Sequence, residues 1–261
     1  MSLEAAFGAI AVSQPAVHTV SVDSTTSSAV LQGELTLSLP PADLTSTSAA
    51  AEVLVYLRMQ PTSIHNSSSY LSTTSVVHIN LTGPSEVRVS LPVLKAPSAR
   101  LWWPHSLGPQ NLYSAETGVV SCQLHSAEDS SSISICWDAV RSLVSASPHR
   151  SVSLHSLLSS LAKEGTGLRS EEEAASLPPG CRCQVSDSIE NLSVGIRTVE
   201  SFVSSVTQGR AFRINGSPLF VTGGNWICSE QLLRLSRERY LAELEMHRRM
   251  GLAMVRVWGG N

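Results

Sequence analysis

The sequence has few aromatic residues, no long apolar run and no block of basic residues. Aromatic side chains make up 5% of its 261 residues, and 18 Lys and Arg stand against 21 Asp and Glu, a net charge of −3. Without a basic patch, we expect no nucleic-acid partner. Without a run of roughly 18 apolar residues, we expect no membrane span. Residues 1–15 also lack the basic and apolar segments of a signal peptide.

Cysteine is scarce and irregularly spaced. The chain has five, at Cys122, Cys136, Cys181, Cys183 and Cys228. An odd number without a regular interval is not typical of a disulfide framework, and Cys181 and Cys183 have no second pair at zinc-finger spacing. We therefore expect free thiols, no metal site and no cofactor. Four N-x-S/T sequons are weak evidence for secretion in a Ser- and Thr-rich chain; they begin at Asn66, Asn80, Asn191 and Asn215.

Residues 16–125 predict antiparallel β-structure. Apolar and polar residues alternate over much of four segments, which are residues 30–39, 51–59, 76–81 and 87–93. This period of two is typical of strands that bury one face. Stretches rich in Ser, Thr and Pro separate the segments and predict loops. The spacing of the strands suits a small β-sandwich.

Residues 126–190 have a different composition. Ser supplies 17 of these 65 positions, and an acidic run at residues 171–173 and the Pro178-Pro179-Gly180 turn follow. Such a segment has little apolar surface to offset the entropy of ordering it. We expect a largely disordered insertion, within which residues 152–161 could form a short amphipathic helix.

The C-terminal 50 residues predict strands and a helix in alternation. Two short strands, residues 211–214 and 219–222, flank Asn215-Gly216, a dipeptide that favours a tight hairpin turn. Residues 223–226 close the second strand. Ser236 is suited to cap a helix over residues 237–250, which Gly251 would end. Residues 253–258 then predict a buried strand, completing a parallel β-α-β unit of the kind that builds a (β/α)8 barrel.

Two parts of the chain carry a resemblance to a known family. Leu101-Trp102-Trp103-Pro104, Gly108 and residues 111–113, with residues 194–197, are similar to the central immunoglobulin-like domain of family 2 glycoside hydrolases. Residues 209–261 resemble the opening of that family's catalytic barrel, with the motifs NG-x-P, GGNW, R-x-x-Y, MG and R-x-WGG in order. The match is to the β-mannosidase type. Asn261 departs from the pattern, where the family has Gly, and so does the Ser-rich insertion.

The resemblance implies a mixed fold, an immunoglobulin-like β-sandwich followed by the truncated start of a (β/α)8 barrel. The sandwich would take residues 1–125 and 191–205, the insertion residues 126–190, and the first βαβ segment of the barrel residues 209–261. The implied reaction is retaining hydrolysis of β-mannosidic bonds, as a β-mannosidase or a mannosylglycoprotein endo-β-mannosidase. The family's two catalytic glutamates lie on later barrel strands. We therefore expect this chain to be a fragment that is inactive alone.

Three residues are candidates for the site. Arg256 lies near the end of an apolar strand, where an unpaired charge is costly, so it needs an acidic partner. The resemblance implies that this partner is the missing nucleophile, and a structural acid is the alternative. Trp258 ends the same strand, suited either to stack on a sugar or to pack at the rim. Asn225 could bind a sugar hydroxyl or brace a loop. For Trp226 we expect loop packing, and for Glu230, Glu238, Glu243 and Glu245 a solvated face.

Other readings remain open. A family 2 exo-β-glucosaminidase shares much of the same opening, and a non-catalytic β-sandwich interaction module with a vestigial tail is the alternative from another class. Trp102, Trp103 and Tyr113 are expected to pack rather than to bind sugar, because adjacent residues of a strand face opposite ways. The expected partner is a carbohydrate, a β-mannoside or an N-glycan. By family, the protein would work in a vacuole, a lysosome or the secretory route.

Overall fold

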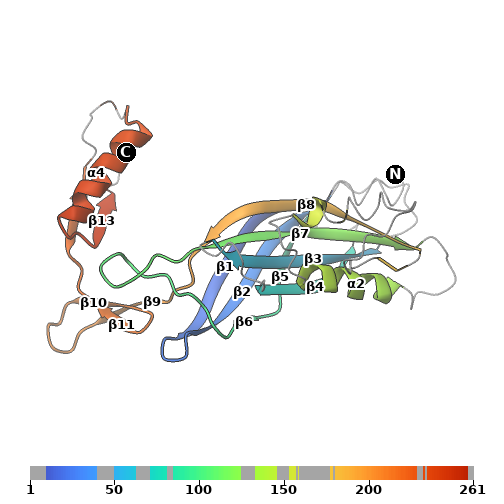
Figure 1. Ribbon diagram of the computed structural model, residues 1–261, viewed down its shortest axis with the longest axis horizontal. Helices are drawn as coiled ribbons and strands as arrows, with labels where there is room; N and C mark the ends of the chain where they lie inside the picture. The colour runs from blue at the N-terminus through green and yellow to red at the C-terminus, as the bar shows by residue number, and fades with distance from the viewer. Residues whose placement is uncertain are drawn as a thin grey trace, which may run out of the picture.

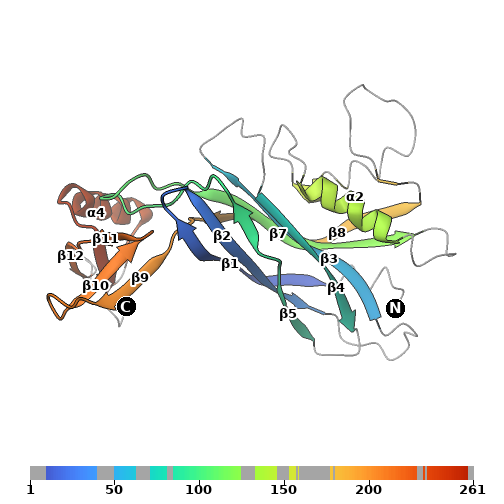
Figure 2. The same ribbon diagram turned by 90° about the horizontal axis from the view of Figure 1, so that it is seen from below.

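The computed structural model shows a β-sandwich connected through a small three-stranded sheet to a β-α-β unit (Figure 1). Helix α2 lies on the sandwich, and helix α4 lies at the opposite end of the molecule in two perpendicular views (Figures 1 and 2). The structure describes residues 10–39, 50–62, 71–80, 85–124, 133–145, 153–156, 158, 177–178, 180–227, 232 and 234–257.

The first sheet is built around β2. Its strands are β1 (Ala11–Asp23), β2 (Ser28–Ser38), β5 (Glu86–Ser90) and β6 (Leu94–Ala96). β1 pairs antiparallel along one edge of β2, and β5 and β6 pair antiparallel along the other. Alternate side chains of β2 face the core, where Leu31, Leu35 and Leu37 are fully buried. The alternation of apolar and polar residues that predicted a strand at residues 30–39 is therefore confirmed in β2.

The second sheet has the order β4-β3-β7-β8, with every pair antiparallel. Its strands are β3 (Ala50–Pro61), β4 (Leu71–Asn80), β7 (Tyr113–Leu124) and β8 (Cys181–Val194). Val55 and Leu57 of β3 face the first sheet, whereas Leu54 and Tyr56 enter a second core on the outer face. The predicted β-sandwich is confirmed, with one of its sheets covered on both faces.

Helix α2 (Ile133–Ser145) covers that outer face, where the sequence predicted disorder. Its buried side chains follow a helical stripe of Cys136, Trp137, Val140, Leu143 and Val144. They pack on Leu54, Tyr56 and Val120 of the sheet. The prediction of a disordered insertion over 126–190 is thus wrong for residues 133–145 and 180–190. The high Ser content outweighed a narrow apolar stripe in the composition. That stripe is enough to hold the helix on the sheet, because the sheet presents an apolar face to it.

The remainder of the 126–190 segment falls largely outside the described residues. Residues 154–156 and 158 are helical, within the short amphipathic helix predicted at 152–161. Leu154 and Leu158 are buried with α2 in the outer core.

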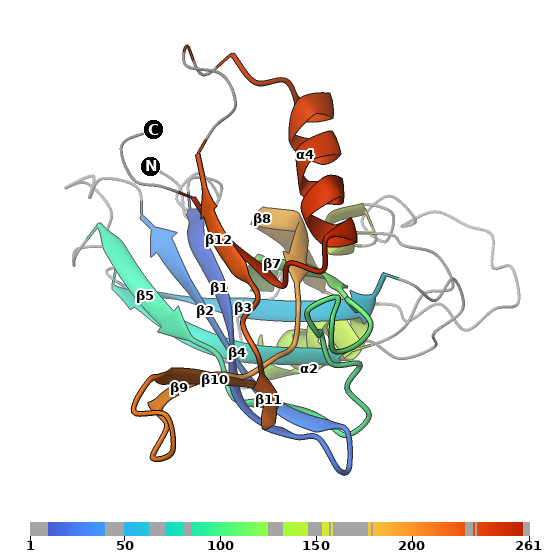
Figure 3. The same ribbon diagram turned by 90° about the vertical axis from the view of Figure 1, so that its left-hand side faces the viewer.

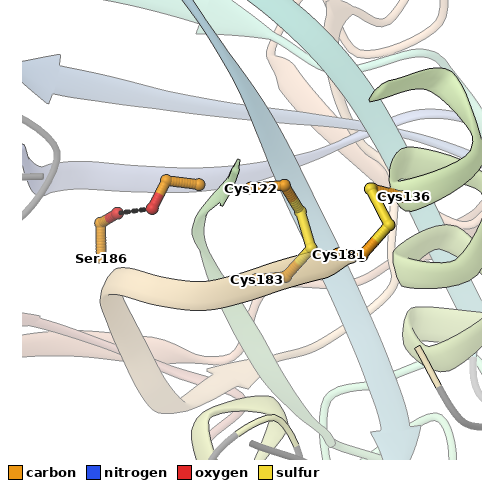
Figure 4. The surroundings of a disulfide bond; sticks show 6 residues. Cys122, Cys136, Cys181, Cys183 and Ser186 are labelled. Carbon is orange, nitrogen blue, oxygen red and sulfur yellow. Dashed lines mark hydrogen bonds between the residues drawn. A yellow bond between two sulfur atoms is a disulfide. The ribbon is translucent and has the colours of Figure 1, made fainter. Parts of the chain in front are cut away.

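One disulfide joins two strands of the second sheet and another joins α2 to that sheet, contrary to the expectation of free thiols (Figure 4). Cys122 of β7 bonds Cys183 of β8, and Cys136 of α2 bonds Cys181 of β8. Residues i and i+2 of a strand point to the same face, so Cys181 and Cys183 both lie under α2. Their partners are 45 and 61 residues away in the sequence, which is why the spacing did not reveal them. Cys228 lies outside the described residues.

A small antiparallel sheet follows the sandwich. Its order is β11-β10-β9, with β9 (Val199–Val203), β10 (Arg210–Ile214) and β11 (Ser217–Leu219). Asn215 and Gly216 have φ of 50° and 78° in the turn between β10 and β11, as the predicted hairpin requires. The assignment of residues 191–205 to the sandwich is wrong for β9, because β9 pairs with β10.

The last described elements are β12 (Gly223–Trp226), α4 (Arg237–Arg249) and β13 (Met254–Val257). β12 and β13 pair in parallel, and Figure 3 shows α4 alongside β12. Ser236 caps α4 by accepting from the Arg239 amide. Gly251, at φ 78°, donates to Arg248 O, and Leu252 donates to His247 O, which ends the helix in a Schellman motif. The predicted strand, helix and parallel strand are confirmed.

Candidate functional site

Two parallel strands bring the candidate residues together. In the register of β12 and β13, Gly223 lies opposite Met254 and Asn225 opposite Arg256. A Cβ on Gly223 would overlap the carbonyl oxygen of Met254, whereas a Cβ on Gly224 would meet open space. Gly223 therefore allows the close approach that aligns the two strands, and the alignment sets Asn225 beside Arg256.

Asn225 and Arg256 form a direct contact. The Arg256 Nη1 donates to Oδ1 of Asn225 at 3.1 Å, and both residues are exposed. A guanidinium carries five N–H donors in a planar fork. This contact uses one of them and leaves other donors for a carboxylate or a sugar oxygen.

The expectation of a buried strand around Arg256 is not met. Met254, Arg256 and Val257 are exposed, because β13 has a single neighbouring strand and α4 buries none of its residues. Among the described residues the Arg256 side chain contacts the Asn225 amide oxygen, and its pairing with an acid of a complete barrel stays a prediction.

A polar and aromatic cluster attaches α4 to β12. The Trp226 Nε1 donates to Glu243 Oε2 at 3.1 Å, and the Trp226 ring meets Tyr240 edge-on with centroids 5.4 Å apart. Arg239 donates to the other Glu243 oxygen at 3.0 Å. The Glu243 side chain is only 12% exposed, so its assignment to a solvated face is wrong. The Arg239–Glu243 spacing of four was the available signal.

The other two glutamates of α4 are both hydrogen-bonded: Glu245 pairs with arginines, and Glu238 accepts hydrogen bonds at the start of the helix. Hydrogen bonds from Arg248 and Arg249 lower the pKa of Glu245 to about 2. The pKa of Glu238 is also below its usual value, because the carboxylate accepts hydrogen bonds from the backbone amide of Glu238 and from the Ser236 hydroxyl. A glycosidase acid needs a raised pKa and a second carboxylate about 5 to 5.5 Å away. These two carboxylates have the opposite property, and neither is suited to be the acid.

The aromatic residues near the end of the sandwich are structural, as expected. Tyr113 is 2% exposed and its hydroxyl accepts from the Arg100 amide at 2.9 Å. Trp103 packs against the inner core, the apolar cluster between the two sheets of the sandwich. Trp102 stacks under the Arg197 guanidinium, 4.7 Å from the ring centroid, and its carbonyl accepts from Asn215 at 3.0 Å. Trp102 thus links the sandwich to the β10–β11 turn.

Of the three predicted site residues, the structure brings Asn225 and Arg256 into contact, and Trp258 lies outside the described residues. The described part of the chain holds no group of three His, Cys, Asp or Glu side chains that could bind a metal ion. Nor does any helix there have the length and apolar character to cross a membrane.

Known proteins resemble this chain in sequence and in fold. No family model matches it. It is 47% identical to the mannosylglycoprotein endo-β-mannosidase of Lilium longiflorum over 75 residues. These aligned residues make up 29% of this chain and 8% of that protein. It is 40% identical over 70 residues to β-mannosidase B of Aspergillus terreus, 26% of this chain and 8% of that protein. The chain therefore spans less than a tenth of the curated relatives it matches.

The solved structures extend the likeness to almost the whole chain. An exo-chitosanase of Amycolatopsis orientalis matches 96% of the chain and 20% of its own, with a TM-score of 0.56 at 16% identity. A glycosyl hydrolase family 2 member of Bacteroides cellulosilyticus matches 97% and 22%, with a TM-score of 0.54 at 13% identity. At such identities the likeness is one of fold. The chain is thus similar in sequence to β-mannosidases over a segment of 70 to 75 residues, and similar in fold to solved structures that include a glycosyl hydrolase family 2 member.

Proposed function

We propose that this chain forms part of a retaining glycoside hydrolase that cleaves β-mannosidic bonds, as a β-mannosidase or a mannosylglycoprotein endo-β-mannosidase. In this proposal the sandwich is the immunoglobulin-like domain of the family. β12, α4 and β13 are the first βαβ segment of a (β/α)8 barrel, whose active sites lie at the carboxyl ends of its strands. The observation that carries the proposal is the parallel pairing that sets Asn225 beside Arg256 at that end.

Arg256 is the positioning residue of the proposed site. Its guanidinium would hold the nucleophile carboxylate ionised and aimed at the anomeric carbon, since a nearby cation lowers a carboxylate pKa. Asn225 fixes the guanidinium through its amide oxygen and keeps its NH₂ group for a sugar hydroxyl. Trp258 would stack on the apolar face of the mannose ring.

Hydrolysis with retention needs a nucleophile and an acid/base carboxylate, and both would come from residues other than those described around β12 and β13. Residues 1–261 by themselves are therefore expected to show no turnover of an aryl β-mannoside. Turnover that co-purifies with the chain and survives dialysis would contradict this assignment.

Two alternatives remain distinct from this proposal. An exo-β-glucosaminidase is suggested by the fold match to an exo-chitosanase, but that match is 16% identical, whereas the sequence matches of 40% and 47% are to β-mannosidases. A non-catalytic sandwich module would need neither Asn225 nor Arg256 to be aligned.

The deciding experiment is to sequence the transcript past Asn261 and to assay the encoded product. A continuing barrel with an Asn-Glu pair at the end of a later strand, and hydrolysis of aryl β-mannoside in preference to aryl β-glucosaminide, is the expected result. The opposite preference would favour the glucosaminidase. A stop codon directly after Asn261 would favour the non-catalytic module.

A further inference from the structure

The two disulfides bear on the sequons. Four of the five cysteines are paired in two crosslinks that tie α2 and β7 to β8. Disulfides of this structural kind form and persist in oxidising compartments such as the lumen of the secretory route. A chain that folds there also meets the machinery that glycosylates Asn-x-Ser/Thr sequons. The sequons, weak evidence alone, therefore become candidate modification sites.

The fold separates the sequons by their surroundings. Asn215 is 3% exposed; its side chain donates to Trp102 O at 3.0 Å and accepts from the Thr198 amide at 2.9 Å. A glycan would be attached to the same amide nitrogen that donates to the Trp102 carbonyl, and this buried position leaves no room for it beside the sandwich. Asn66 lies outside the described residues, as does Thr82, which completes the sequon of Asn80.

Asn191 has the opposite surroundings. It lies on β8 with φ 59°, where the register shifts so that Glu190 and Asn191 together oppose a single residue of β7. Asn191 and Ser193, the two determining residues of the sequon, are both exposed, while Leu192 between them packs against the inner core. The bulge thus presents the Asn191 amide to solvent without any change in the sheet.

We propose that Asn191 is an N-glycosylation site. Its amide nitrogen would form an N-glycosidic bond to the anomeric carbon of an oligosaccharide carried on a polyprenyl diphosphate. The amide loses one proton, and the polyprenyl diphosphate leaves with the bonding electron pair. β8 is the edge strand of its sheet, and exposed strand edges invite pairing with other chains. A hydrated oligosaccharide at Asn191 covers part of that edge.

The test uses the whole chain, expressed behind a secretion leader in a eukaryotic host. The disulfide-bonded chain is collected from the lumen and the medium, treated with an N-glycan amidase in ¹⁸O water, then reduced, alkylated and digested with trypsin. Cleavage at arginine separates Asn191 on residues 183–197 from Asn215 on residues 214–234. The amidase converts a glycosylated Asn to ¹⁸O-labelled Asp, so mass spectrometry reports each site separately.

We expect the label on the Asn191 peptide and none on the Asn215 peptide. Ser193→Ala should abolish the label at Asn191, and the matched variant Ser193→Thr should keep it, because threonine also completes the sequon. An unlabelled Asn191 peptide in the disulfide-bonded chain would overturn the proposal, and so would a label that persists in Ser193→Ala.

Discussion

The side chains of Asn225 and Arg256 meet across the parallel strands β12 and β13, with Nη1 of Arg256 donating to Oδ1 of Asn225 at 3.1 Å. An amide oxygen is a neutral acceptor, so it orients the guanidinium without neutralising it. The charge of Arg256 therefore remains available to a carboxylate that approaches the same end of the strands.

The first prediction concerns Arg256 in the complete enzyme and rests on the proposed function. Arg256→Met should reduce kcat/KM roughly ten- to hundredfold, because a charged hydrogen bond contributes about 1.5 to 3 kcal/mol. Loss of the cation raises the nucleophile pKa, so the acid limb of the pH–rate profile should move to higher pH. Arg182→Met, which removes an exposed guanidinium from β8, is the control.

Asn225→Ala should have a smaller effect of a different kind. It removes the anchor and leaves the charge, so kcat/KM should fall while the acid limb stays in place. If Arg256→Met folds and retains kcat/KM and the acid limb of the parent enzyme, then Arg256 has no part in the reaction.

A second prediction tests the alignment of β12 with β13. Gly223→Ala places a methyl group against the Met254 carbonyl, whereas Gly224→Ala places one in open space. Overpacking of this kind costs about 1 to 3 kcal/mol. Amide exchange over residues 253–257 should therefore accelerate roughly five- to 150-fold in Gly223→Ala. Gly224→Ala should exchange like the parent chain, and equal exchange in the two variants would refute the steric argument.

A third prediction concerns the disulfide between α2 and β8. The double variant Cys136→Ser with Cys181→Ser should lose about 2 to 4 kcal/mol of unfolding free energy, because the crosslink restricts the unfolded chain. Trp137 of α2, which is 3% exposed where the helix packs on the sheet, should become more accessible to a fluorescence quencher as the helix detaches. Reductant should destabilise the parent chain by more than the double variant. An unchanged unfolding free energy would mean that packing alone holds α2.

A fourth prediction follows from a buried network beneath α2. The Tyr56 hydroxyl donates to Glu116 Oε1 at 2.6 Å, and Arg58 donates from Nε to Glu116 Oε2 at 2.8 Å. The backbone amide of Leu154 also donates to Glu116, at 3.1 Å. Burial, and then the charge of Glu116, raise the pKa of Tyr56 well above its ordinary value.

The sign of the pH effect follows from that shift. Below the unfolded tyrosine pKa of about 10, Tyr56 is protonated in both states and its contribution is fully present. Above about pH 10 the unfolded chain releases the proton and the folded chain keeps it. Stability should therefore fall by about 1.4 kcal/mol per pH unit from this residue. Tyr56→Phe should lower stability at neutral pH but show a shallower alkaline loss in denaturant titrations; an identical alkaline slope would contradict the burial effect.

Much of the C-terminal unit could be predicted because its signals are local. The Asn215-Gly216 turn, the Ser236 cap and the Gly251 stop each depend on the conformational preferences of one or two residues. The alternation along β2 and β3 likewise predicted strands, because side chains of a strand alternate wherever one face is buried. These features need no knowledge of distant parts of the chain.

Other features depend on contacts between residues far apart in the sequence. Composition predicted disorder where α2 packs, since only the folded sheet supplies the apolar face that the helix covers. Spacing predicted free thiols, because the partners of Cys181 and Cys183 come from a different strand and from the helix. The sequons of Asn191 and Asn215 are the same motif, yet one lies on an exposed bulge and the other is buried against Trp102. The sequence by itself determined the local elements and the family resemblance. Tertiary structure alone decided which faces, thiols and amides are covered, because burial arises from what packs around a residue and local propensity does not specify it.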